Sequence, residues 1–351
     1  MLKNNFFYYP ILLFAFLFIL DKIFLLEKVK AFIKPDFTHI YYEVREDLFE
    51  QLLKDEEVKL KKKKLMIILG SSRLLYFDAR ELKEFYPNWS FYNFSSAVTT
   101  PAYYYYYLEK FLEHKIYPDL LLLETDANQF NANSPVFKGS NLTYSFNPSF
   151  VLKYWNLFGK ENLSFYFGKY FFAVGKNKPY LDTAYKRYQD PNFLAIITMQ
   201  DYTRNFLLAN QGNALSLVEN YVEKDFGSLI ATSQRTLDWV YTNYEFSNMQ
   251  FTFYEKILEE IRSQQIPLLI VIPQVSIPLQ KLLRESKFYK PWKEKIDSIT
   301  EKYNYKILDM AEDENYYCNA FVDGGHIAKD CYHAFMRFIM IKYYAKYDLK
   351  K

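Results

Sequence analysis

The chain has 351 residues, of which 50% are hydrophobic, 24% are charged and 20% are aromatic. This apolar content excludes a disordered or collagen-like chain. A net charge of only +3 provides no broad basic field, so we expect no nucleic-acid partner. Two cysteines are too few for a disulfide-dense scaffold or a four-cysteine zinc site, and the scattered histidines show no ligand spacing. We therefore expect no metal and no cofactor.

The N-terminal segment is apolar enough to cross a membrane. Residues Phe6 to Leu20 carry no charge, and the apolar character resumes from Ile23 to Leu26 after Asp21 and Lys22. Counted as 6–26, the segment would span roughly 31 Å as a helix, close to the thickness of a bilayer core. A single-pass anchor is expected, because no small-residue cleavage site follows the apolar run. A cleaved signal peptide and a buried or interfacial helix are the alternatives.

Five short apolar runs predict the strands of a sheet: Leu65–Gly70, Ser90–Phe94, Asp119–Glu124, Ile266–Ile272 and Tyr305–Leu308. Helical patterns alternate with them, at about Leu74–Phe85, Pro101–His114, Phe251–Gln264, Leu279–Tyr303 and Ala328–Tyr347. Strands that alternate with helices indicate a doubly wound α/β fold, a three-layer α/β/α sandwich with a five-stranded parallel sheet. Such sheets bind ligands at the carboxyl ends of their strands.

A long segment between the third and fourth expected strands breaks this alternation. It is rich in Tyr, Phe, Asn and Lys and has no apolar strand-like run before Leu194–Ile197. One interpretation is a helical cap that covers the carboxyl edge of the sheet, where ligands bind. The other is an addition to the fold that has no role at the site. The expected divisions are an anchor (1–30), a charged helical linker (31–64), the first part of the α/β domain (65–132), the insertion (133–246) and the second part (247–351).

The turn after the first expected strand carries two serines. Gly70, Ser71, Ser72 and Arg73 lie where the strand would give way to a helix. A serine there lies beside a helix N-terminus, where free N–H groups can stabilise a developing oxyanion, and Gly70 allows a tight turn. Serines are also good helix caps, so taken alone the turn favours capping over catalysis.

A second motif lies just before the terminal helix. Asp323 precedes His326 by three residues, with Gly324 and Gly325 between them. A neutral imidazole accepts a serine proton when a carboxylate fixes its tautomer and stabilises the imidazolium. Seen alone, the motif is more typical of a surface turn with a histidine at a helix entry. Together with the serine turn and the sheet, it predicts a site of nucleophilic catalysis.

These two motifs resemble those of the SGNH (GDSL-type) hydrolase superfamily, in particular its membrane-anchored branch, which includes proteins of alginate and teichoic-acid O-acylation. The resemblance covers about 65–131 and 249–347. It implies an SGNH/flavodoxin-like sheet with Ser72 as the nucleophile. It further implies that Asp323 and His326 form the Asp-x-x-His block and that Gly70 is the glycine of the first block.

The other two family blocks are less complete in this chain. The third block, Gly-x-Asn-Asp, corresponds to Asp126–Gln129, where only Asn128 matches. The resemblance therefore implies that the Asn128 side chain and the backbone N–H of Ser72 stabilise the oxyanion. The second block has no glycine, so a backbone N–H between Ser95 and Val98 would have to act as the oxyanion donor of that block.

Cys318 and Cys331 flank the Asp323–His326 turn. A bond between them would close a loop around the turn and add roughly 3 kcal/mol of stability, whereas two unpaired buried thiols are the alternative. Because disulfides form in oxidising compartments, the cysteine pair and the family resemblance favour an extracytoplasmic, periplasmic domain. The lysines that follow the apolar segment favour the opposite orientation. We expect the extracytoplasmic one, with the anchor in the cytoplasmic membrane.

The expected function is that of a membrane-anchored serine esterase or acyltransferase acting on acyl esters, with acetyl esters foremost, in the cell envelope. One alternative is an O-acetyltransferase that modifies an extracytoplasmic polysaccharide and takes its acyl group from a membrane acyltransferase partner. The other is a catalytically inactive envelope protein on the same fold. Membrane lipid, contacted through residues 6–26, and an acyl-ester or polysaccharide substrate are the remaining expected partners.

Overall fold

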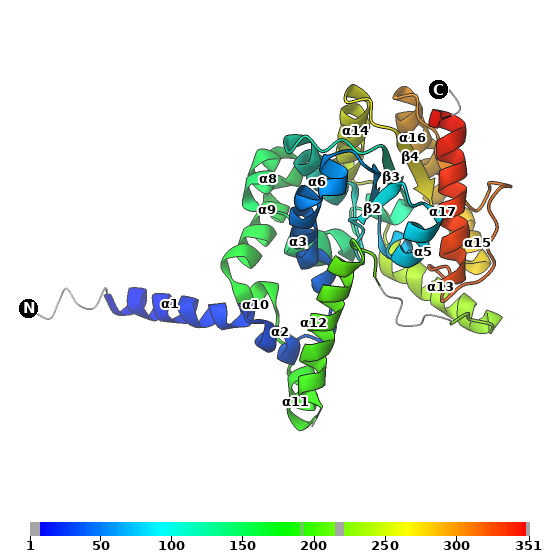
Figure 1. Cartoon of the computed structure of the whole chain (residues 1–351). Helices are drawn as coiled ribbons and strands as arrows, with labels where there is room; N and C mark the ends of the chain where they lie inside the picture. Colours follow the sequence, from blue (N-terminus) through cyan, green and yellow to red (C-terminus); the bar gives the residue numbers. More distant parts are fainter. Residues whose placement is uncertain (1–7, 191, 215–220, 349–351) are drawn as a thin grey trace, which may run out of the picture.

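The computed structural model describes residues 8–190, 192–214 and 221–348. Within them, five strands form one sheet in the order β2-β1-β3-β4-β5, with every neighbouring pair parallel (Figure 1). The predicted five-stranded parallel sheet is confirmed, and each strand begins and ends within two residues of its expected bounds. The strands are β1 (Lys64–Leu69), β2 (Trp89–Asn93), β3 (Leu120–Glu124), β4 (Leu268–Ile272) and β5 (Ile307–Asp309).

The helices of the α/β part differ from expectation in two places. The helix expected from about Leu74 starts later, because a 3-10 helix, η3, follows β1 and Asp78 caps the next helix. The stretch expected as one helix from Leu279 to Tyr303 is two helices. Their bounds are η3 (Ser72–Leu74), α5 (Ala79–Phe85), α6 (Pro101–Glu113), η4 (Ala127–Phe130), α14 (Asn248–Ser263), α15 (Ile277–Glu285), α16 (Tyr289–Lys302), α17 (Asp330–Tyr343) and η6 (Tyr344–Asp348).

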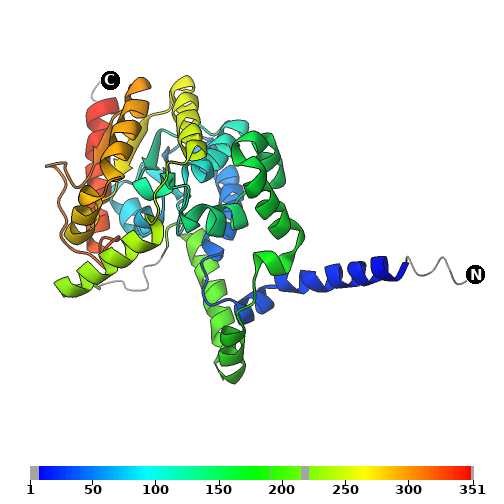
Figure 2. The same cartoon turned by 180° about the vertical axis from the view of Figure 1, so that it is seen from behind.

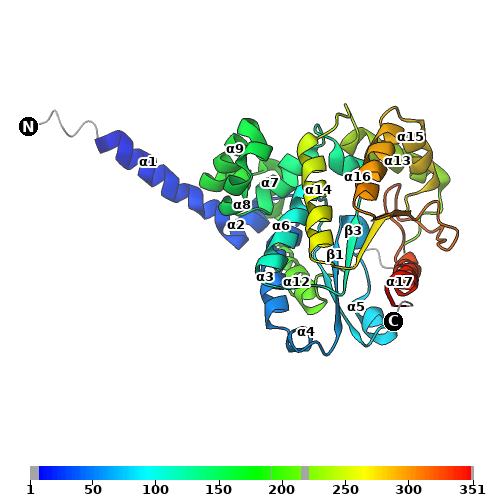
Figure 3. The same ribbon diagram turned by 90° about the horizontal axis from the view of Figure 1, so that it is seen from above.

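Alternate side chains of β1 enter two separate hydrophobic clusters. Leu65, Ile67 and Leu69 pack in the cluster that contains the apolar faces of α6, α14 and α16. Met66 and Ile68 pack in the cluster that contains α5 and α17. Figure 3 shows these two groups of helices on opposite sides of the sheet. Because both faces are covered, β1 is apolar at nearly every position rather than at every second one.

The N-terminal helix projects from the rest of the molecule (Figures 1 and 2). Helix α1 (Tyr8–Asp21) and the 3-10 helix η2 (Lys22–Leu25) include an 18-residue stretch of mean hydropathy 1.9, of which 6% is buried. This stretch is long and apolar enough to span a membrane, and its exposure argues against a helix buried in the protein core. Phe6 and Phe7, at the start of the expected span, lie outside the described residues.

The two charged residues at the end of this helix contact the insertion. The Asp21 carboxylate accepts hydrogen bonds from the backbone N–H groups of Ala173 (2.5 Å) and Val174 (2.8 Å). The Lys22 ammonium donates to the carbonyl of Phe171 at 2.5 Å. Asp21 and Lys22 therefore connect the apolar helix to the folded body, a role that the sequence pattern did not indicate.

The segment expected as a charged linker is part of the folded body. It forms α2 (Glu27–Ile33), α3 (Ile40–Lys54) and α4 (Glu56–Lys59). Leu48 and Leu52 of α3 are 0% and 1% exposed and belong to the same cluster as α6. The hydroxyl groups of Tyr106 and Tyr107, both on α6, donate to Glu46 of α3 at 3.3 and 3.2 Å. Residues 31–64 thus pack against the α/β domain.

The insertion is helical, as expected, and Leu194–Ile197 belongs to a helix rather than a strand. Its α10 lies beside η2, and Phe171 at the end of α9 accepts a hydrogen bond from Lys22 of η2. Its α11 and α12 pack on α2 and α3, and its α13 packs on α15. Helix α13 reaches the turn that contains Asp323 and His326, where the Thr232 hydroxyl accepts a hydrogen bond from the N–H of Gly324 at 3.0 Å. Glu223, just before α13, also contacts the turn, through a hydrogen bond from its N–H to the carbonyl of Phe321 at 2.7 Å. The bounds are η5 (Phe137–Asn141), α7 (Leu142–Tyr144), α8 (Pro148–Lys153), α9 (Trp155–Phe171), α10 (Ala173–Lys176), α11 (Leu181–Gln189), α12 (Phe193–Ala209) and α13 (Phe226–Val240).

Candidate active site

Ser72 is the first residue of η3, immediately beyond the carboxyl end of β1. Ser71 precedes it and caps η3, with its Oγ accepting a hydrogen bond from the N–H of Arg73 at 3.3 Å. Ser71 is buried, whereas Ser72 is partly exposed. The sequence left open whether these serines cap a helix or take part in catalysis. In the structure Ser71 acts as the cap, and the Ser72 hydroxyl remains accessible.

The Ser72 hydroxyl meets the histidine of the second motif. Its Oγ lies 2.7 Å from Nε2 of His326. On the other side of the imidazole ring, Nδ1 lies 2.9 Å and 3.0 Å from the two carboxylate oxygens of Asp323. An acceptor at Nδ1 favours the tautomer that carries its proton there, and this leaves Nε2 free to accept the serine proton. The structure thus brings together the three residues that the sequence separated into two motifs.

A tight turn holds Asp323 and His326 in this relation. Phe321 and Ile327 form an antiparallel bridge around the turn, and the N–H of Val322 donates to the carbonyl of His326 at 3.0 Å. The side chains of His326 and Asp323 are 34% and 38% exposed, so solvent and a substrate can reach the dyad.

Hydrogen bonds to the Asp323 carboxylate keep it ionised. Partial burial raises the pKa of Asp323, but the hydrogen bond and charge interaction with His326 and the N–H groups of Gly325 and His326 outweigh it. Those N–H groups donate to Oδ1 at 2.7 and 2.9 Å. The net effect is a pKa below the ordinary value of 3.8. At neutral pH the carboxylate is therefore charged and able to stabilise an imidazolium.

Two of the three glycines at the site occupy positions where a side chain would collide. A Cβ at Gly70 would lie 2.8 Å from the Cβ of Leu74 and 2.9 Å from the Glu124 carboxylate. A Cβ at Gly324 would lie 2.6 Å from the backbone of Ser233 in α13. At Gly325 the nearest atom would be 3.6 Å away, an ordinary contact. Gly70 and Gly324 thus allow close approach of other elements, whereas Gly325 has room for a methyl group.

The implied oxyanion donors are only partly available. The N–H of Ser72 donates to the carbonyl of Ala97 at 3.3 Å, so it would have to exchange this long hydrogen bond for one to a substrate. In the second block, the N–H groups of Ser95, Ser96 and Val98 donate to other protein oxygens. Among the described residues, the Ala97 N–H of that block has no protein acceptor.

Asn128 lies in η4, just beyond the carboxyl end of β3. Because β1 and β3 are paired neighbours, with Leu69 opposite Leu123, η3 and η4 follow adjacent strand ends. The backbone N–H of Asn128 donates to Asp126 at 2.9 Å. Its side-chain amide has no hydrogen-bond partner within the described part of the chain and is free to bind a ligand.

A buried carboxylate supports the serine turn, and the sequence reasoning missed it. Glu124, 1% exposed at the end of β3, accepts hydrogen bonds from the N–H of Ser71 (2.6 Å), from its hydroxyl (2.7 Å) and from the amide of Gln129 (3.2 Å). Burial raises the pKa of Glu124, although Arg73 and the Ser71 donors oppose this. The acidic residue that ends the leucine run of β3 is the sequence signal that could have revealed it.

An ion pair joins the residue after Ser72 to the third block. Arg73 Nη1 lies 2.5 Å from Oδ2 of Asp126, and both side chains are buried. Burial lowers the pKa of Arg73, but the Asp126 carboxylate outweighs it and holds this pKa well above its ordinary value. The Tyr241 hydroxyl also donates to Asp126, at 2.7 Å. Arg73 and Asp126 therefore hold η3 and η4 against each other beside Ser72.

A comparison with known families covers nearly the whole chain. Residues 1–343 match a family described as "Protein of unknown function (DUF1574)". The chain belongs to the DUF1574 family. The match extends over the N-terminal helix, the α/β domain and the insertion. No curated protein matches the chain.

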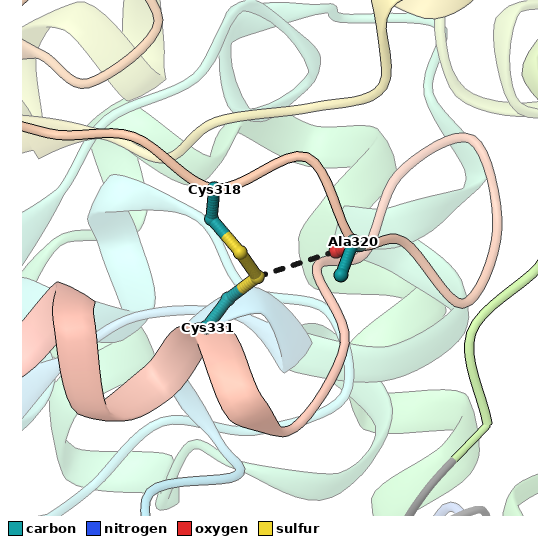
Figure 4. The surroundings of a disulfide bond; sticks show 3 residues. All are labelled: Cys318, Ala320 and Cys331. Carbon is teal, nitrogen blue, oxygen red and sulfur yellow. Dashed lines mark hydrogen bonds between the residues drawn. A yellow bond between two sulfur atoms is a disulfide. The ribbon is translucent and has the colours of Figure 1, made fainter.

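This DUF1574 protein has a disulfide next to the candidate dyad. Cys318, in the loop before the turn, is joined to Cys331, in the first turn of α17, with the Cα atoms 5.7 Å apart (Figure 4). Cys331 is fully buried, and its sulfur lies 3.3 Å from the carbonyl oxygen of Ala320. The closed loop contains Asp323 and His326, so the bond restricts the segment that carries them.

One group of potential metal ligands occurs among the described residues of this DUF1574 protein. Atoms of Glu27, His39 and Glu43 lie within 4.8 Å of one another. The ammonium of Lys30 lies 2.8 Å from Glu27 and 3.0 Å from Glu43, and it supplies the charge that balances these carboxylates. His39 is completely buried, and burial, together with Lys34 and Lys30, lowers its pKa to about 3. The lysine thus occupies the place of a cation.

Proposed function

We propose that this DUF1574 protein is a membrane-tethered serine esterase or acyltransferase that works through an acyl-enzyme on an SGNH-like three-layer sandwich. The observation that carries the proposal is the contact of the Ser72 hydroxyl with His326 Nε2 at 2.7 Å, while Asp323 binds the opposite ring nitrogen. A nucleophile, a base and a residue that orients the base are the minimum set for this chemistry.

The reaction has two steps. Ser72 Oγ attacks the ester carbonyl and forms a new C–O bond, while His326 takes the serine proton. The tetrahedral intermediate collapses with cleavage of the bond to the alcohol, and His326 returns the proton to the leaving alcohol oxygen. In the second step, water or an acceptor hydroxyl attacks the acyl-enzyme. His326 takes the proton of the attacking group and gives it to Ser72 as the acyl group leaves. Asp323 stabilises the imidazolium in both steps.

The oxyanion is assigned to the Asn128 side-chain amide together with backbone N–H groups. The Ser72 N–H exchanges its 3.3 Å bond to Ala97 for the substrate oxygen, and the Ala97 N–H is the further donor in the second block. A donor aimed at the developing negative charge lowers the activation free energy by about 3 to 4 kcal/mol. The ion pair of Arg73 with Asp126 holds η3, which carries the Ser72 N–H, beside η4, which carries Asn128.

The tether is the apolar helix α1 with η2, and the catalytic domain is assigned to the extracytoplasmic side. The disulfide supports this side, since structural disulfides persist in oxidising compartments. The lysines that follow the apolar segment argue for the opposite side by the positive-inside rule, so the proposal gives the disulfide more weight than these flanking charges.

Transfer to a sugar hydroxyl uses the same three residues as hydrolysis. Transfer is a second candidate function, because His326 and Asp323 are partly exposed and an acceptor larger than water can reach them. In that case a membrane acyltransferase would supply the acyl group. Mass analysis of an added acetylated donor and glycan acceptor distinguishes the two, since only transfer moves the acetyl mass to the glycan.

Labelling with a fluorophosphonate probe tests the proposal. The full-length protein in detergent is treated with the probe and digested, and the modified peptide is identified by mass spectrometry. We expect one phosphonate on Ser72, no labelling of Ser72→Ala and undiminished labelling of Ser263→Ala, whose hydroxyl lies on the surface at the end of α14. An unlabelled wild-type protein would support the inactive envelope protein instead.

A further inference from the structure

A cavity of about 450 Å³ lies where the N-terminal helix meets the insertion. Its walls come from the end of α1, from η2, from α7 and from the C-terminal part of α9 with α10. Lys22, Lys169 and Lys176 line it, the other lining residues are mostly aromatic or aliphatic, and no described carboxylate lines it. The cavity is therefore both cationic and apolar.

We propose that this cavity binds the phosphate headgroup of an anionic phospholipid. The lysines bind the phosphate oxygens, and the apolar wall formed by Phe18 and Leu25 accommodates the adjoining part of the acyl chains. The volume falls within the range of small-molecule sites. The assignment rests on the membrane tether in the proposed function, and it is independent of the chemistry at Ser72.

The lysines keep hydrogen-bond donors available for such a ligand. An ammonium group has three donors. The Lys169 ammonium donates to the carbonyl of Gly175 at 2.8 Å, and the Lys176 ammonium lies 5.7 Å from the centre of the Tyr144 ring. Lys22 contacts Asp21 at 3.2 Å as well as the Phe171 carbonyl. Lys169 and Lys176 thus have no described carboxylate within ion-pair distance, and phosphate oxygens can take that place.

The surroundings add further positive charge. Lys34, 6% exposed, donates to the Tyr144 hydroxyl at 2.8 Å, and the Tyr144 ring borders the cavity. Burial lowers the pKa of Lys34 to about 8 and also lowers the pKa values of Lys169 and Lys176. Burial is the main cause of these shifts, so the charged form of each lysine carries a desolvation cost. A bound anion would offset that cost.

The position of the cavity favours a lipid over a soluble phosphate compound. Lys22 lies in the last turn of the apolar stretch that ends at Leu25, near the level where phospholipid headgroups surround the end of a membrane span. Beside it, the aromatic residues Tyr170, Phe171 and Phe172 are 42 to 55% exposed. Exposed aromatic side chains at the end of a span are typical of the membrane interface.

Thermal unfolding of the full-length protein in a neutral detergent tests the assignment. The ligands are short-chain phosphatidylglycerol, short-chain phosphatidylcholine and inorganic phosphate. We expect phosphatidylglycerol alone to raise the Tm in a saturable manner. The double variant Lys169→Gln/Lys176→Gln should weaken that binding about 100-fold, because each charge-assisted hydrogen bond is worth about a factor of ten. The matched control Lys160→Gln/Lys186→Gln removes two exposed charges of the insertion that do not line the cavity and should bind normally.

Other results would overturn the assignment. Equal shifts with phosphatidylcholine would show that the headgroup charge is irrelevant, and an equal shift with inorganic phosphate would show that the ligand is a free anion. The variant Lys169→Arg/Lys176→Arg keeps both charges and should keep the lipid-induced shift, which distinguishes lost charge from lost folding. Extraction of membranes at alkaline pH tests the tether separately. Release of the protein there would contradict the tether, while a phosphatidylglycerol-specific shift in detergent would still establish the site.

Discussion

The Ser72 hydroxyl and His326 Nε2 lie 2.7 Å apart, although 254 positions separate the two residues in the chain. β1 places the serine at the carboxyl edge of the sheet, and the turn before α17 places the histidine against it. The contact leads to a first prediction. His326→Gln should lower turnover of an aryl acetate by at least about 10³-fold, because the serine proton then has no acceptor.

The measurement is the initial rate on p-nitrophenyl acetate for the full-length protein. His333→Gln is the matched control, because His333 is partly exposed on α17 and lies 3.7 Å from Glu81, away from the dyad. It should retain full activity. Equal losses of activity in both variants would mean that the substitutions act by disturbing the structure around α17 and not by removing a proton acceptor.

The ionised Asp323 carboxylate should stabilise the folded protein at neutral pH and lose this effect in acid. Its pKa is lower in the folded protein than its ordinary value of 3.8, so the ionised carboxylate stabilises the fold above about pH 4. That contribution is lost as the pH falls through the lower folded pKa. Asp323→Asn lacks it throughout. The Tm difference between wild type and Asp323→Asn should therefore shrink as the pH falls from about 4 through the lower folded pKa.

Thermal unfolding in buffers of equal ionic strength measures this difference. The same variant should lose activity at neutral pH, because an amide cannot stabilise the imidazolium and also permits the wrong tautomer. A Tm difference that grew as the pH fell below about 4 would contradict the assigned direction of the pKa shift.

The two neighbouring glycines of the turn should respond differently to alanine. Gly324→Ala places a methyl group 2.6 Å from the backbone of Ser233, so α13 or the turn must move, at a cost of about 1 to 3 kcal/mol. The movement should also weaken ester turnover, since Asp323 and His326 lie in the same turn. Gly325→Ala meets no atom closer than 3.6 Å and should leave the Tm nearly unchanged. Equal Tm values for the two variants would show that α13 does not pack on the turn.

The disulfide should be a measurable part of the stability. Replacing Cys318 and Cys331 by serine should reduce the free energy of unfolding by about 3 kcal/mol, because the bond closes a short loop. Reductant should lower the Tm of wild type toward that of the variant and leave the variant unchanged. Alkylation of freshly lysed cells without reductant should modify neither cysteine, and modification of both would contradict the bond and the extracytoplasmic assignment.

Much of the fold could be predicted because its signals are local. Strands β1 to β4 are short runs buried on both faces, as Met66 and Ile67 of β1 illustrate, and such a run is recognisable without its partners. The short β5 is only partly buried. The helix starts were predicted less well. The capping serine and Asp78 delay α5 after β1, because side-chain hydrogen bonds at a turn can replace a helical start.

The candidate site could be predicted only in its chemically distinctive members. Ser72, Asp323 and His326 stand in short motifs with glycines, and the motifs themselves indicated acid–base chemistry. Glu124 and the pair of Arg73 with Asp126 could not be assigned a role, because each acts through a partner that lies at least 50 residues away.

The sequence by itself determined the alternation of strands and helices, the apolar N-terminal helix and the identity of the three candidate catalytic residues. The tertiary structure decided the strand order, the contact of α13 with the Asp323–His326 turn and the cationic cavity around Lys169 and Lys176. The physical reason for this division is that a local hydrophobic pattern depends only on which side chains of its own segment are buried. Which segments then become neighbours depends on chain crossings and on contacts such as that of Asp21 with Ala173, which link distant positions.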